Sequence, residues 1–220
     1  ESFFEGQAGK SEREQVVVFI AGHANGHDEN AKLHLPGRDV DFKTLISWLD
    51  GIKTKQMIVV LATPQGEAWM KKFSRPGRVI LAGNGLRKHN ALPVMFLKFF
   101  PAELLASSSP GEGAQSAQIS LADVFLRTHQ KVMEWYRTNG LYPTEEPYLE
   151  ADGDGKGIVP PADEVQEAAA GSAAAGTAES ERLEALRKSM EKIQGEMPDL
   201  RLAQQVLFKV PGGNRETAAK

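Results

Sequence analysis

The chain has 220 residues, enough for one sizeable domain and an appendage. Its 26 Lys and Arg residues against 29 Asp and Glu residues argue against a nucleic-acid partner, because such proteins usually carry a basic excess. Cysteine is absent, so disulfides, thiolate metal sites and cysteine nucleophiles are excluded. No stretch approaches the roughly 18–20 apolar residues of a membrane span, and the first residues lack a signal-peptide pattern, so we expect no membrane span.

Three short apolar runs, at residues 16–20, 57–61 and 78–81, show no alternation with polar residues. This pattern is typical of strands buried on both faces of a parallel sheet. Between them, apolar spacings of three and four residues predict a helix that ends at Gly51, and residues 67–73 can form a second short helix. Strands that alternate with helices indicate an α/β fold with helices on both faces of the sheet.

The second half of the chain is less regular. We expect a buried helix over residues 92–105, and a second helix that is capped by Ser120 and stops at Asn139 and Gly140. The expected organisation is an N-terminal polar segment (1–15), an α/β domain (16–158), an Ala-rich linker (159–180), an amphipathic helix (181–194) and a C-terminal tail (195–220). The helix at 181–194 either docks on its own domain or binds a partner.

Each predicted strand leads into a loop of small and polar residues, and the carboxyl ends of parallel strands form the crevice where ligands bind. His23 follows the first strand and Thr63 follows the second. The other candidates for lining this cleft are Gly22, Ala24, Gln65, Gly66 and Asn84. Arg38, Arg75, Arg78 and Arg87 surround these loops in sequence and could hold an acidic peptide.

Six pieces of the chain, in order, carry a resemblance to a known family. They are the first strand ending in Gly22 and His23, Leu-Pro-Gly-Arg-Asp at 35–39, the second strand ending at Gly66, the third strand after Pro76, Ser120 to Phe125, and Thr-Glu-Glu-Pro at 144–147 with Asp-Gly-Asp-Gly at 152–155. Together they resemble the legumain-like branch of the caspase-like cysteine peptidases over residues 16–158.

The resemblance implies a caspase-like three-layer α/β/α sandwich around a mostly parallel sheet. In the family, a strand, a helix and a second strand precede the segment that matches residue 16, and only fifteen residues stand before it here. We therefore expect the fold to lack its first strand–helix–strand unit, either because a longer precursor has been cut or because a second polypeptide completes the sheet. The resemblance also slightly favours an exported or periplasmic location, although the residues themselves show no targeting motif.

Matched to the family, His23 falls on the catalytic histidine and Thr63 falls on the catalytic cysteine. Gln65 stands where the family has serine, Gly66 matches, and Ala24 replaces a glycine. A hydroxyl is a poor nucleophile without a strong base, so the chain is similar to non-catalytic bacterial members of the family. We expect a pseudopeptidase that binds or scaffolds a protein or peptide; the alternative is a peptide hydrolase that uses His23 with Thr63, or a nucleophile supplied elsewhere.

Two groups of side chains raise the question of metal binding. His23, His27 and His34 lie near acidic residues, but in a loop without the spacing that zinc sites use, so we expect no metal there. Glu150, Asp152 and Asp154 match the first half of a calcium loop, but Pro161 stands where its bidentate glutamate belongs. A solvated turn is the expectation, and a weak millimolar calcium site is the alternative. No cofactor is expected.

Overall fold

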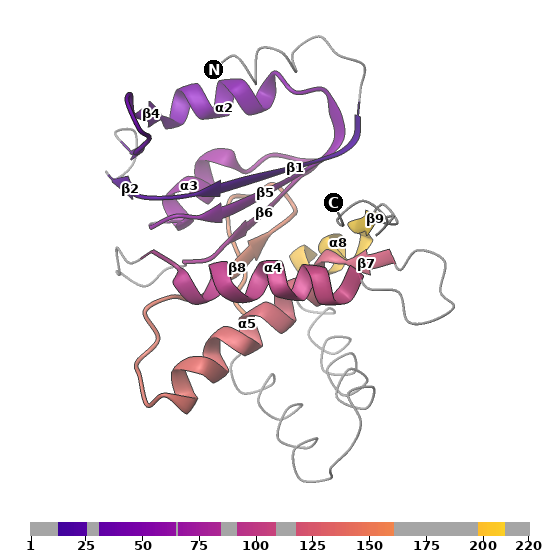
Figure 1. The fold of residues 1–220 in the computed structure, drawn as a ribbon. Helices are drawn as coiled ribbons and strands as arrows, with labels where there is room; N and C mark the ends of the chain where they lie inside the picture. The colour runs from indigo at the N-terminus through magenta and orange to yellow at the C-terminus, as the bar shows by residue number, and fades with distance from the viewer. Residues whose placement is uncertain are drawn as a thin grey trace, which may run out of the picture.

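The structure, a computed structural model, describes residues 13–25, 31–64, 66–84, 92–108, 118–160 and 198–209. Its centre is a four-stranded sheet in the order β1-β5-β6-β8 (Figure 1). The strands are β1 (Arg13–Ala21), β5 (Thr54–Ala62), β6 (Arg78–Ala82) and β8 (Tyr148–Glu150). β5 runs parallel to both β1 and β6, which confirms that the three apolar runs lie side by side, whereas β8 is antiparallel to β6.

Helices cover both faces of this sheet, as the alternating pattern predicts (Figure 1). One face packs against α2 (Phe42–Asp50) and α3 (Gly66–Phe73), where Phe42 and Trp69 meet with ring centroids 4.1 Å apart. The other face packs against α4 (Val94–Ser108) and α5 (Leu121–Thr138). The molecule is thus a mixed α/β protein with a mostly parallel open sheet between two helical layers.

The helix boundaries follow from capping residues that the sequence displays. Asp41 accepts a hydrogen bond from the Thr44 N–H at 2.8 Å and caps α2, which ends at Gly51. Ser120 accepts from the Asp123 N–H at 3.4 Å and caps α5, which ends at Asn139. Both expected helix ends are confirmed.

Several short elements give no signal in the sequence. A small antiparallel sheet joins β2 (Ala24–Asn25), β3 (Lys32–Leu33) and β4 (Val40–Asp41). Residues 198–209, within the expected tail, form α8 (Pro198–Gln205) and β9 (Leu207–Lys209), and β9 pairs with β7 (Gln118–Ser120). This part of the tail therefore packs on the domain. The predicted helix at 181–194 and the linker from residue 161 lie outside the described residues.

Glu145, from the Thr-Glu-Glu-Pro segment, caps α4 from a distant part of the chain. Its carboxylate accepts hydrogen bonds from the N–H groups of Met95 and Phe96, each at 2.9 Å, and from the Tyr136 hydroxyl at 3.0 Å. A negative charge at a helix N-terminus is favourable, and the N–H groups of Met95 and Phe96 would otherwise lack this acceptor. Glu145 thereby joins α4, α5 and the segment that leads into β8.

We expect Glu145→Ala to lower the free energy of unfolding by about 3 kcal/mol, because it leaves buried donors without an acceptor. Glu145→Gln keeps one acceptor oxygen and should cost less. Urea unfolding followed by circular dichroism measures both, with Glu134→Ala as the control, since Glu134 is an exposed residue of α5. Equal unfolding midpoints for Glu145→Ala and Glu134→Ala would contradict the capping role.

His129 is a histidine in the middle of α5 that is only 2% exposed, and neither ring nitrogen has a hydrogen-bond partner. Burial lowers the pKa of His129 to about 4 from its ordinary 6.5. The unfolded chain therefore takes up a proton before the folded one does, and stability is lost as the pH falls from 6.5 toward 4.

We expect His129→Met to remove this loss, so that the variant gains about 2 kcal/mol over the wild type when the pH is lowered from 7 to 4.5. Urea unfolding at the two pH values measures the difference, with the exposed His23→Met as the control. The same pH dependence in wild type and His129→Met would show that His129 is not held neutral.

Candidate functional site

The loops after β1, β5 and β6 lie together at the carboxyl ends of these parallel strands. Ala21 pairs with Ala62, and the next residue, Gly22, donates its N–H to the Ala62 carbonyl at 3.3 Å. On the other side of β5, the Gly83 N–H donates to the Leu61 carbonyl at 2.9 Å. The structure thus places His23 and Thr63 directly after the ends of neighbouring strands, as the sequence predicts.

Thr63 is wholly buried, and its hydroxyl has no hydrogen-bond partner within the described part of the chain. The residue that follows, Pro64, is buried too and has no N–H to donate. A serine- or threonine-type nucleophile needs an adjacent base and a path to the substrate carbonyl. Among the described residues no base contacts the Thr63 hydroxyl, and the side chain is closed to solvent.

His23, by contrast, is exposed. Its carbonyl accepts a hydrogen bond from the His34 N–H at 2.9 Å, which holds the backbone of the loop against the segment that leads out of β3. Its ring makes no hydrogen bond to the Thr63 hydroxyl. The two residues are neighbours in the fold, but they do not form the nucleophile–base pair that peptide hydrolysis requires.

The other candidate cleft residues are explained by packing. A Cβ on Gly66 would lie 2.8 Å from the Asn84 carbonyl oxygen and 2.9 Å from the Ala82 Cβ, so only glycine lets α3 begin this close to β6. Gly22 has a φ of 152°, which side chains rarely adopt. Ala24 and Asn84 are buried, and Gln65 lies outside the described residues.

Two of the four arginines lie at the amino ends of the parallel strands, away from the loops that carry His23 and Thr63. Arg78 begins β6, where its guanidinium donates to Asp50 Oδ1 and to the Phe73 carbonyl, each at 2.9 Å. Arg75 pairs with the other Asp50 oxygen at 2.7 Å. Arg75 and Arg78 therefore join α2, α3 and β6, and they are not placed to hold an acidic peptide at the crevice loops. Arg87 lies outside the described residues.

The described members of the histidine group, His23 and His34, do not belong to a cluster that could hold a metal. His34 Nδ1 lies 3.1 Å from Asp39 Oδ1, and both side chains are exposed. Among the described residues, the groups of side chains able to hold a metal do not include a histidine. His27 and Asp28 lie outside the described residues.

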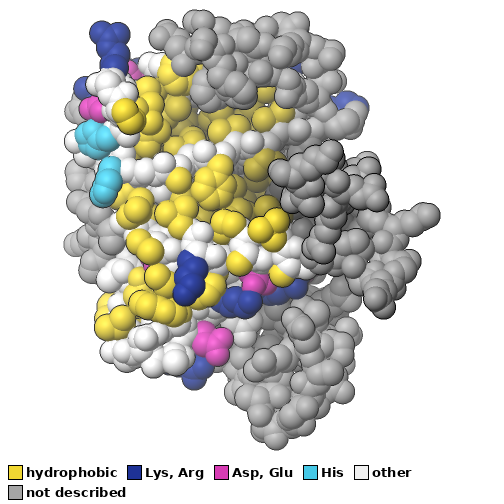
Figure 2. Space-filling view, in the orientation of Figure 1, with side chains coloured by type: hydrophobic (Ala, Val, Ile, Leu, Met, Phe, Trp, Pro, Cys, Tyr) yellow, Lys and Arg dark blue, Asp and Glu magenta, His cyan; other side chains and the backbone are white. Residues whose placement is uncertain are grey.

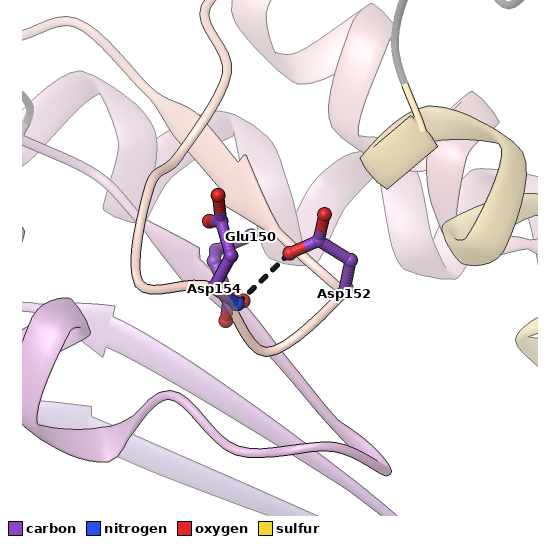
Figure 3. A group of neighbouring side chains, drawn as sticks. All are labelled: Glu150, Asp152 and Asp154. Carbon is purple, nitrogen blue, oxygen red and sulfur yellow. Dashed lines mark hydrogen bonds between the residues drawn. The ribbon is translucent and has the colours of Figure 1, made fainter.

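A second candidate site lies at the turn after β8, where one carboxylate oxygen from each of Glu150, Asp152 and Asp154 comes within 4.8 Å of the others (Figure 3). Glu150 is fully buried, while the two aspartates are exposed. Burial raises the pKa of the Glu150 carboxyl, and the negative charge of Asp199 adds to this. Three carboxylates on one short turn form an oxygen-rich cluster of the kind that hard cations bind.

Asp199, which the sequence analysis did not single out, lies beside this turn. It is 3% exposed and accepts hydrogen bonds from the N–H groups of Ala151, at 2.6 Å, and Asp152, at 3.0 Å. Burial raises the pKa of Asp199, and repulsion from Asp152 and Asp154 adds to this. No local pattern could reveal this contact, because Asp199 is 47 and 48 residues away from its partners.

The edge of β1 is the other feature of interest. No strand of the described residues pairs with β1 on the side away from β5. Val17 and Phe19 are 46% and 44% exposed, although their register partners on β5, Ile58 and Val60, are fully buried. Figure 2 shows apolar side chains gathered on this face, over β1 and toward α4.

Within the described residues, no helix has the length and apolar character to cross a membrane. Comparison with known proteins adds no assignment: no protein-family model matches the chain, and no curated protein does.

Proposed function

We propose that this chain is a non-catalytic domain of the caspase-like peptidase type, from the legumain-like branch, that binds another polypeptide. The order of the sequence motifs and the position of His23 and Thr63 after neighbouring parallel strands support the family assignment. The observation that carries the loss of catalysis is the burial of Thr63, because a side chain without solvent access and without a base cannot attack a carbonyl.

Binding is supported by the open edge of β1. An edge strand presents unpaired N–H and C=O groups, and an extended segment of another chain can add to it by backbone hydrogen bonds. On the α4 side of the sheet, the helical layer covers Phe19 only in part. Its ring centroid lies 6.2 Å from that of Phe100, and the residue stays 44% exposed. A partner strand with apolar side chains at alternate positions would cover Val17 and Phe19 and extend the sheet.

The loss of catalysis can be tested with single thiols, because the chain contains no cysteine. We expect Thr63→Cys to react with Ellman's reagent about a hundredfold more slowly than His23→Cys in the folded protein, and equally fast in denaturant, since only the exposed thiol meets the reagent. Equal rates in the folded protein would show that position 63 is open to ligands.

The unaltered protein should cleave no peptide in a library. Cleavage that His23→Ala abolishes would overturn the proposal.

The binding edge predicts how the isolated chain behaves. Without a partner, we expect a second copy to occupy the open edge, so light scattering should report self-association that grows with protein concentration. The double variant Val17→Lys with Phe19→Lys should be monomeric, because charges on an edge strand oppose strand addition. Leu141→Lys with Tyr142→Lys, which alters two exposed apolar residues elsewhere, is the control. A wild-type chain that stays monomeric at high concentration would contradict the proposal.

A further inference from the structure

From the geometry at the end of β8 we infer a calcium-binding site formed by Glu150, Asp152 and Asp154. The observation that goes beyond a surface acidic cluster is the state of Glu150. Its side chain is fully buried, and while Oε1 accepts hydrogen bonds from the Ser74 hydroxyl at 3.0 Å and the Gly153 N–H at 2.6 Å, Oε2 is buried without any hydrogen-bond partner.

An unsatisfied carboxylate oxygen in the interior is costly, and a proton does not relieve the cost here. Protonated Oε2 would need an acceptor, and no acceptor lies within hydrogen-bond distance of it. A cation would give this carboxylate a partner that needs no acceptor. One oxygen of Glu150 lies within 4.8 Å of an oxygen of Asp152 and of Asp154, which bring two further negative charges to the turn.

The ligands and their spacing favour calcium among the common cations. The donors are all carboxylate oxygens, which hard cations prefer over the softer transition metals. Ca²⁺ binds oxygen at about 2.3–2.6 Å, so two ligands on opposite sides of the ion lie up to about 5 Å apart. Oxygens within 4.8 Å of one another are compatible with such a shell. Mg²⁺ needs a tighter octahedron with oxygens at about 2.0–2.1 Å.

The surrounding groups set the expected affinity. Asp152 Oδ1 accepts from the Asp154 N–H at 2.9 Å, which holds the Asp152 carboxylate against the turn (Figure 3). Lys156 Nζ lies 3.2 Å from Asp154 Oδ2 and competes for that oxygen as an exposed ion pair. Three protein carboxylates with water in the remaining positions, one of them shared with a lysine, predict a dissociation constant in the millimolar range.

Calcium binding is measured by isothermal titration calorimetry, and stabilisation by thermal unfolding at constant ionic strength with CaCl₂ or MgCl₂. We expect one Ca²⁺ per chain and a rise in Tm of about 3 °C at ten times the dissociation constant, with a smaller response to Mg²⁺. Asp152→Asn with Asp154→Asn should abolish the binding heat and the rise. Asp39→Asn with Glu134→Gln removes the same charge elsewhere and should leave both unchanged.

Glu150→Gln separates ion binding from a merely structural role. It removes one of the three carboxylates but keeps the shape of the side chain, so neither its Tm nor its binding heat should respond to added calcium. Absence of binding heat in the wild type, retention of it in the Asp152→Asn and Asp154→Asn double variant, or an equal response to Mg²⁺ would overturn the calcium site.

Discussion

The in-register parallel pairing of β5 with β1 and β6 is the constraint on which the rest of the structure depends. Residues 57–62 of β5 are buried, so the strand needs a helical layer on each face and a neighbour on each edge. Because the strands run parallel, His23 and Thr63 lie at their carboxyl ends, and Arg78 pairs with Asp50 at their amino ends. The candidate site and the Arg78–Asp50 ion pair are thereby separated by the length of a strand.

Much of this arrangement could be predicted from local pattern. Apolar runs without alternation identified the three parallel strands, and Gly51 and Ser120 marked real helix ends. The two-residue strands β2, β3 and β4 and the three-residue β8 are too short to show any period. Glu145 and Asp199 bind backbone groups that lie about 50 residues away, and long-range partners leave no mark on local sequence.

The sequence located the candidate sites better than it described their surroundings. It singled out His23 and Thr63, but the contrast between an exposed imidazole and a buried hydroxyl arises from tertiary packing. At the acidic turn it favoured a solvated loop. Glu150 stands two residues after Tyr148 on β8, and alternation along the strand puts both on the face where Tyr148 belongs to the core, but three residues are too few to reveal this in the sequence.

The cap on α4 has a consequence for biosynthesis. Met95 and Phe96 leave the ribosome about 50 residues before Glu145 does, so the nascent helix has no anion at its first turn while the intervening chain is made. Helices without such support are marginal in water. The layer made by α4 and α5 should therefore consolidate late in translation, after β1, β5 and β6 have already emerged.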